Sequence, residues 1–142
     1  MPKLSVWLVR ASLVHMGIGF LFGALILHHK GIPIYPWTWR LLNLHAELMI
    51  FGWTMQLVMG VAFFALPRFS QREQRYGPVR LGWWSFFLLN GGVALTAVAH
   101  WFNAASFVLV GRLLVLLAVI VYVILMWPRV RPFGSYAASL SD

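Results

Sequence analysis

Four long apolar stretches constrain this chain more than any other feature of its sequence. They run from about 6 to 27, 41 to 66, 81 to 102 and 105 to 127. Crossing a hydrocarbon core of about 30 Å takes about 20 apolar residues in a helix, so each stretch is long enough to span a bilayer. A helix also satisfies its own backbone hydrogen bonds inside lipid. The sequence therefore predicts an all-α integral membrane four-helix bundle, with residues 1–142 as a single transmembrane domain.

Composition supports a membrane protein and excludes several kinds of site. Of the 142 residues, 61% are hydrophobic and 10% are charged, and a soluble domain of this size cannot bury so much apolar surface. The first stretch lacks a small-residue cleavage site, so we expect it to remain as a helix. The absence of cysteine excludes disulfides, iron–sulfur clusters and covalently attached haem. Few buried charges and no broken inverted repeat argue against a transporter or channel.

The basic residues indicate an orientation in the membrane. The net charge is +8, from 11 Lys and Arg against 3 Asp and Glu, but the basic side chains cluster at helix ends, so no nucleic-acid partner is expected. One side of the predicted topology carries most of them: Lys3, Arg10, Arg68, Arg72, Arg75, Arg80, Arg129 and Arg131. The other carries Lys30, Arg40 and Arg112. Because basic residues favour the cytoplasmic face, we expect cytoplasmic N and C termini in the cell's inner (plasma) membrane, with lipid around the helices.

Five histidines lie in or beside the predicted spans: His15, His28, His29, His45 and His100. A neutral imidazole is the usual protein ligand of haem iron, and polar groups inside lipid are usually paired or functional. His28 and His29 stand at a helix end and are expected to be solvated interface residues. His15 and His100 remain open between packing residues with hydrogen bonds and ligands.

The second apolar stretch is patterned around His45. At 3.6 residues per turn, one helix face carries His45, Met49, Gly52, Gln56 and Met59, with Gly60 close to it. The glycines leave a shallow surface on which a flat macrocycle could lie. They equally suit close packing of two helices in a membrane, and both interpretations stay open.

Depth limits the partners of His45. At 1.5 Å per residue, His15 should lie roughly 15 Å from His45 along the membrane normal, so the two cannot ligate one iron. A second ligand could come from His100, from the His28/His29 pair, or from His45 of another subunit. His15 would then hold a second haem or hydrogen-bond a neighbouring carbonyl.

Glu47 is the only acid in a predicted span. It points about 200° around the helix from His45 and should therefore face a neighbouring helix. Arg112 and Arg40 lie at similar depth. Either arginine could pair with Glu47 or with the propionates of a haem, and a purely structural salt bridge is an equal alternative.

The segment from His45 to Gly60, continuing to Pro67, resembles the second helix of subunit I in the haem–copper oxidase superfamily, which includes cytochrome oxidases and nitric oxide reductases. In that family a histidine near the outer end of this helix is an axial ligand of the low-spin haem. A glycine and a proline recur there at the offsets of Gly60 and Pro67. The resemblance implies that His45 binds haem b, a membrane cofactor suited to electron transfer.

The resemblance covers only the first four helices of a subunit that normally has twelve or more. The family's second axial ligand, its high-spin haem ligand and its copper-binding histidines come from later helices. No copper and no complete oxygen- or nitric-oxide-reducing site are therefore expected in this chain alone. The family fold consists of similar four-helix arcs, which implies that this chain forms a homo-oligomer, a dimer or a trimer, or joins a larger redox complex.

The sequence thus favours a small membrane b-type cytochrome that binds haem b through His45. Its expected cofactor contacts are His45 and His100 at the metal, Gly52 and Gly60 beneath the macrocycle, and Arg40 and Arg112 near the propionates. The alternative is a cofactor-free structural or assembly subunit of a respiratory or photosynthetic membrane complex.

Overall fold

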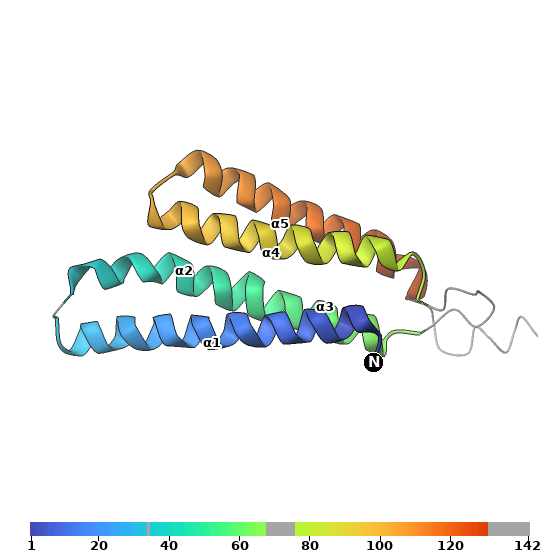
Figure 1. Ribbon diagram of the computed structural model, residues 1–142, viewed down its shortest axis with the longest axis horizontal. Helices are drawn as coiled ribbons and strands as arrows, with labels where there is room; N and C mark the ends of the chain where they lie inside the picture. The colour runs from blue at the N-terminus through green and yellow to red at the C-terminus, as the bar shows by residue number, and fades with distance from the viewer. Residues whose placement is uncertain (34, 68–75, 131–142) are drawn as a thin grey trace, which may run out of the picture.

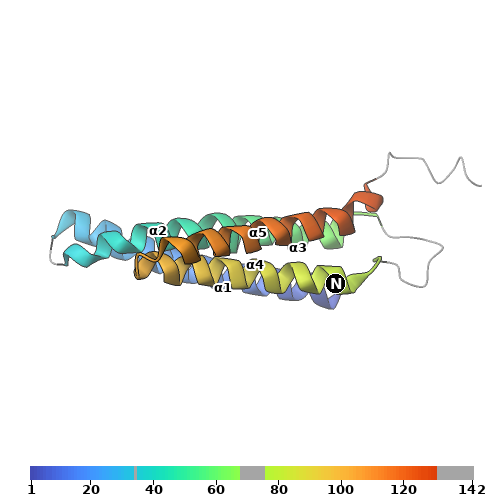
Figure 2. The same cartoon turned by 90° about the horizontal axis from the view of Figure 1, so that it is seen from above.

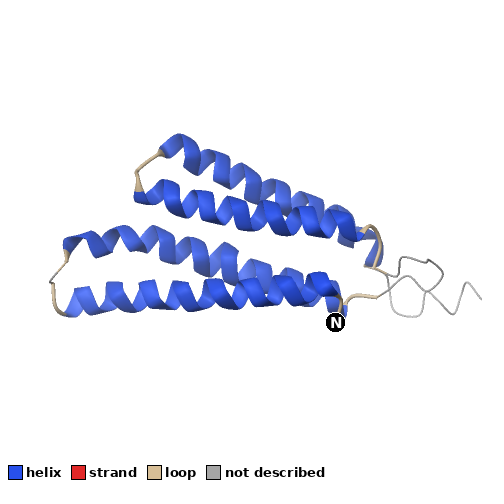
Figure 3. Ribbon diagram, viewed as in Figure 1, coloured by secondary structure: helices blue, strands red, loops and turns tan. Residues whose placement is uncertain are grey.

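The protein forms two antiparallel helical hairpins packed against each other (Figure 1). The structure, a computed structural model, describes residues 1–33, 35–67 and 76–130. The first hairpin pairs α1 (Lys3–Gly31) with a continuous run of η1 (Pro36–Arg40), α2 (Leu41–Glu47), η2 (Leu48–Met55) and α3 (Gln56–Ala65). The second pairs α4 (Val79–Trp101) with α5 (Ala105–Met126), and η3 (Trp127–Arg129) follows. The described residues contain no strand (Figure 3), which confirms the all-α prediction.

The described part of the chain contains four helices that are long and apolar enough to cross a membrane: Lys3–Gly31, Pro36–Ala65, Val79–Trp101 and Ala105–Arg129. They coincide with the four predicted stretches, but the first is longer than expected. At 29 residues it is about 43 Å long, so its ends extend beyond a hydrocarbon core of about 30 Å. The N-terminus and the end of α5 lie at one end of the bundle (Figure 1). The half of the bundle that includes this end is called the terminal half below.

The turn between α4 and α5 is tight. Asn103 adopts a φ of 55°, a left-handed conformation that asparagine tolerates at the end of a helix. The amide N–H of Ala104 then donates to the carbonyl of Ala99 at 2.9 Å, and that of Asn103 donates to His100 at 3.3 Å. These two bonds satisfy carbonyls at the end of α4 and reverse the chain.

The second span is not a regular α-helix. Residues Leu48–Met55 are π-helical, and the Thr54 hydroxyl donates to the Met49 carbonyl, five residues back, at 2.9 Å. Counting at 3.6 residues per turn could not predict this widening. π-Helical turns are rare and often occur at functional sites, and this one directly follows the segment that carries His45 and Glu47.

Small residues let the two helices of the first hairpin approach closely. The Ser5 hydroxyl donates to the Gly60 carbonyl at 2.7 Å. A Cβ added at Gly60 would lie 3.0 Å from the side chains of Leu8 and Val9. Close approach at glycine combined with side-chain-to-backbone hydrogen bonds is the usual means of helix association in membranes.

The hydrophobic core joins the hairpins chiefly in the terminal half. Seen from above, both hairpins run along the same long axis (Figure 2). The core comprises Leu4, Leu8, Leu48, Met59, Phe63, Leu89, Val93, Val115, Ala118, Tyr122, Leu125 and Met126. The Tyr122 hydroxyl donates across it to the Met59 carbonyl at 2.5 Å.

Arg129 is a structural residue as well as a basic one. We expected it to be part of the cytoplasmic charge cluster, but it is only 1% exposed. Its Nε donates to the Pro67 carbonyl at 3.0 Å, and its Nη2 donates to Phe63 at 2.9 Å and Leu66 at 2.8 Å. The arginine thereby satisfies carbonyls at the end of α3, which a helix leaves without intrahelical partners. The arginines expected at 68, 72, 75 and 131 lie outside the described residues.

Candidate haem-ligand site and buried ion pair

The side chain of His45 lies between α2 and α1. Its Nδ1 is 2.7 Å from the carbonyl oxygen of Gly19. A carbonyl only accepts, so Nδ1 carries the proton and donates, and Nε2 is left with its lone pair. A Cβ at Gly23 would lie 2.9 Å from Cε1 of His45, so this glycine makes room for the ring. Metal-binding histidines usually have this arrangement, in which a second group fixes the tautomer and orients the ring.

His15 occupies a parallel position further along the hairpin. Its Nδ1 lies 3.1 Å from the Gly52 carbonyl and 3.1 Å from Oε1 of Gln56. The carbonyl hydrogen bond considered for His15 is thus present. Because His45 faces Gly19 while His15 faces Gly52 and Gln56, the two imidazoles are about 10 Å or more apart along the bundle. This is shorter than the roughly 15 Å expected from the sequence, but the two imidazoles are still too far apart to ligate one iron.

The glycine face of the second span is covered by α1. Gly52 lies under the His15 ring, where a Cβ would come 2.7 Å from Cγ, and Gly60 lies under Leu8 and Val9. The grouping of His45, Gly52 and Gly60 on one face is therefore confirmed. In this packing the two glycines contact helix α1, which corresponds to the close-packing interpretation, and they do not form an open surface for a macrocycle.

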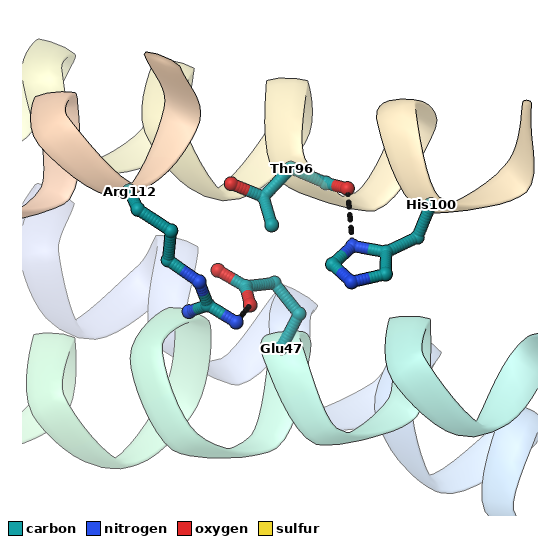
Figure 4. Close-up of polar contacts among 4 residues, drawn as sticks. All are labelled: Glu47, Thr96, His100 and Arg112. Atoms are coloured by element: carbon teal, nitrogen blue, oxygen red, sulfur yellow. Dashed lines mark hydrogen bonds and ion pairs between the residues drawn. The ribbon is translucent and has the colours of Figure 1, made fainter. Parts of the chain in front are cut away.

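The remaining histidines differ from one another in their hydrogen bonds. His100 lies on α4, with its Nδ1 2.9 Å from the Thr96 carbonyl, so its Nε2 is also left free. It lies beside Glu47 (Figure 4), whereas the observed contacts of His45 are with α1. The structure therefore brings His100 to Glu47 and does not group it with the contacts of His45.

The expectation that both His28 and His29 are solvated holds only for His28, which is exposed. His29 is 8% exposed, and its Nδ1 accepts a hydrogen bond from the Tyr35 amide at 3.2 Å. Its ring also meets Trp39 edge to face at 6.2 Å. His29 is buried because it closes the turn between α1 and η1. With Nδ1 as the acceptor, the proton of the neutral ring is on Nε2, the opposite tautomer to that of His45.

Glu47 forms an ion pair with Arg112, one of the two arginine partners that the sequence left open. Oε2 of Glu47 lies 2.8 Å from Nη2 of Arg112; the carboxylate side chain is 0% exposed and the arginine side chain 42% exposed. The guanidinium also lies over the Phe51 ring, 4.7 Å from its centroid. This is the only ion pair within the described residues, and Arg40 is exposed without one.

Two buried oxygens beside this pair have no hydrogen-bond partner: Oε1 of Glu47 and Oγ1 of Thr96. Figure 4 shows both side chains in the space between α2 and α4, with His100 on one side and Arg112 on the other. Buried polar atoms of this kind are normally satisfied by protein groups or by ordered water. His100 also lines a pocket of about 340 Å³ that includes Asn43 and Asn103.

Sequence reasoning did not identify Thr96 or Gly23 as parts of these sites. Thr96 carries no sequence signal, because only the pairing of α4 with α2 places it beside Glu47. Gly19 and Gly23 could have been found, since their spacing of four residues puts them on one helix face opposite a histidine helix.

No group of three or more His, Cys, Asp or Glu side chains that could hold a metal ion exists within residues 1–33, 35–67 and 76–130. Searches of family models, curated proteins and solved structures found no match to this chain.

Proposed function

We propose that the protein is a small membrane b-type cytochrome in which His45 supplies one axial ligand to haem b. The observation that carries this proposal is the 2.7 Å hydrogen bond from His45 Nδ1 to the Gly19 carbonyl, which leaves Nε2 unprotonated. Such a bond also raises the basicity of the ligating nitrogen. When bound, haem b would supply a one-electron carrier, and the role of the chain is to hold and orient that group.

The surroundings of His45 within one chain leave no described pocket for a haem. None of the described pockets is lined by His45, and the glycines beside it are covered by α1. We infer that a second subunit completes the site, so that the haem lies between chains in a homo-oligomer. The second axial ligand is then an imidazole of the neighbouring chain, and His45 itself is our first choice. An interface between two copies is commonly symmetric, which places the same residue on both sides.

The proposed setting is the plasma membrane, with both termini in the cytoplasm and His45 in the outer half. The charge distribution supports this orientation. The Glu47–Arg112 pair lies on a different face of the second span from His45. In this proposal the ion pair links α2 to α5. Arg112 is partly exposed, so its remaining guanidinium N–H groups can donate to a haem propionate.

A second candidate function is a cofactor-free structural subunit of a larger membrane complex. The observation in its favour is that Gly52 and Gly60 are used for helix packing. In this case the hydrogen bond of His45 to Gly19 serves only to hold α1 and α2 together. Colour separates the two candidates, because a protein without haem has no visible absorption.

The first test is a dithionite-reduced minus oxidised visible spectrum of detergent-purified protein supplied with haem. We expect a sharp b-type α-band in the wild type and in His28→Ala, since His28 is exposed, and none in His45→Ala. Carbon monoxide added to the reduced protein should leave the band unchanged if both axial positions hold imidazoles. A wild type that stays colourless after haem supplementation would refute the cytochrome proposal and leave the structural one.

A further inference from the structure

A groove between α1 and α4 in the terminal half is lined by charged and polar side chains to which the proposed function assigns no role. Its volume is about 300 Å³. The walls are mostly apolar, but they include a cation and two polar side chains. The lining residues are Trp7, Arg10, Ala11, Val14, His15, Phe86 and Asn90.

The charge of Arg10 has no counterpart in the described part of the chain. Arg10 is exposed, and no ion pair is found for it. The only carboxylate of a described side chain belongs to Glu47, which is paired with Arg112. A guanidinium in a membrane-spanning helix needs hydrogen-bond acceptors and a counter-charge, because lipid tails offer neither. Another molecule can supply both.

The position of Arg10 along α1 indicates which molecule that is. Helix α1 exceeds the hydrocarbon thickness by about 13 Å shared between its two ends, so about its first turn lies in the headgroup layer and Arg10 lies just below it. Trp7, an aromatic residue typical of the interface, stands one turn before Arg10. The long arginine side chain extends toward the headgroups at this level, which brings its guanidinium to the phosphates.

Deeper in the groove, Asn90 offers a second polar contact. Its Nδ2 donates to the Phe86 carbonyl at 2.8 Å, which leaves one amide N–H and the Oδ1 oxygen uncommitted. His15 lines the same groove with its Nδ1 already bonded inside the hairpin. In a phospholipid the ester carbonyls lie below the phosphate, toward the membrane centre. The remaining N–H of Asn90 suits such a carbonyl.

We propose that this groove binds an anionic phospholipid. The phosphate pairs with Arg10, an ester carbonyl accepts a hydrogen bond from Asn90, and an acyl chain lies against Val14 and Phe86. Charge complementarity decides the class of lipid. The chain has a net charge of +8, so it attracts a headgroup with a net negative charge more strongly than a zwitterionic headgroup. The proposal does not depend on haem.

The test is lipid retention by the detergent-purified full chain, measured by native mass spectrometry. Phosphatidylglycerol and phosphatidylcholine with identical acyl chains serve as the probes. We expect the wild type to retain phosphatidylglycerol about tenfold better, because both headgroups carry the phosphate but the choline cation of phosphatidylcholine opposes the positive charge of Arg10. Arg10→Gln should remove this preference. Asn90→Leu should weaken binding of both lipids while keeping the preference.

Arg80→Gln is the matched control. Arg80 stands at the start of α4, in a different pocket with Trp83 and Trp84, and its loss removes the same charge. Retention of the preference in this variant supports a defined site at Arg10. The proposal is overturned if Arg10→Gln behaves as the wild type, or if both arginine variants lose the preference equally. Occupation of the groove by a neutral lipid, independent of Arg10, also overturns it. Circular dichroism checks that each variant is folded.

Discussion

At the scale of single residues, the ring nitrogen that carries the proton distinguishes the histidines of this protein. His15, His45 and His100 each direct Nδ1 at a backbone carbonyl, whereas Nδ1 of His29 accepts from a backbone amide. The first arrangement leaves Nε2 free to bind a metal, and the second does not. The protein thus contains three imidazoles in the ligand tautomer, and the proposed function assigns the haem to His45.

The room for the His45 ring is set by Gly23, and this can be tested directly. In Gly23→Ala the new methyl would lie 2.9 Å from Cε1 of His45, so the ring must move away from the Gly19 carbonyl. We expect a lower haem content with a shifted α-band, and a loss of about 1 kcal/mol in the free energy of unfolding from overpacking.

Gly17→Ala is the control for that substitution, since no atom lies within 4 Å of its Cβ position. It should keep the wild-type spectrum and stability. The measurements are the reduced-minus-oxidised spectrum and unfolding in mixed micelles. Equal spectra for the two alanine variants would show that the Gly19–His45 contact does not position a ligand.

At the scale of secondary-structure elements, hydrogen bonds from side chains to helix backbones join the two hairpins. Tyr122 on α5 binds the Met59 carbonyl, and Arg129 in η3 binds three carbonyls at the end of the first hairpin. All of these acceptors belong to α3 or to the two residues that follow it. These hydrogen bonds therefore fix the first hairpin to the second through α3 and the residues that follow it.

Arg129→Leu should destabilise the protein strongly. It leaves the carbonyls of Phe63, Leu66 and Pro67 without their donor, and a buried polar group that loses its partner costs about 1–3 kcal/mol. Allowing for water at the membrane interface, we expect a loss of about 3 kcal/mol in the free energy of unfolding. Tyr122→Phe removes one bond and should cost about 1 kcal/mol.

Unfolding of purified protein by increasing mole fractions of sodium dodecyl sulfate measures these free energies. Arg40→Leu removes an exposed arginine without an ion pair and should stay within about 0.5 kcal/mol of the wild type. If Arg129→Leu were as stable as Arg40→Leu, Arg129 would not be holding α3.

At the scale of the whole molecule, the arrangement of the hairpins puts both chain ends of the described bundle on one side and the Asn103 turn on the other. The predicted orientation assigns the first side to the cytoplasm. Because the chain has no cysteine, single cysteines can report the orientation without background. A membrane-impermeant maleimide should label Asn103→Cys in intact cells, and Lys3→Cys only after permeabilisation. The reverse pattern would place His45 in the inner half and contradict the positive-inside argument.

Much of the architecture follows from the sequence alone. The number and order of the spans follow from the length of the apolar stretches, because lipid thickness sets how many residues a helix needs. The face shared by His45, Gly52 and Gly60, and the pairing of Glu47 with a basic residue at similar depth, follow from helical periodicity and from the cost of an unpaired charge in lipid. Span length, helical periodicity and depth in the membrane all depend on position along the chain, so the sequence is sufficient to determine them.

Only the tertiary structure decided which helix covers which face. The sequence left Gly52 and Gly60 open between a haem surface and a packing surface, and α1 covers them because its own residues complement the glycines. It also left open whether Arg112 or Arg40 pairs with Glu47, and in the packed structure the side chain of Arg112 on α5 is the one that reaches the carboxylate. The π-helical turn and the burial of Arg129 had no local signal. Contacts between segments far apart in the chain depend on three-dimensional packing, which no periodicity within a single helix encodes.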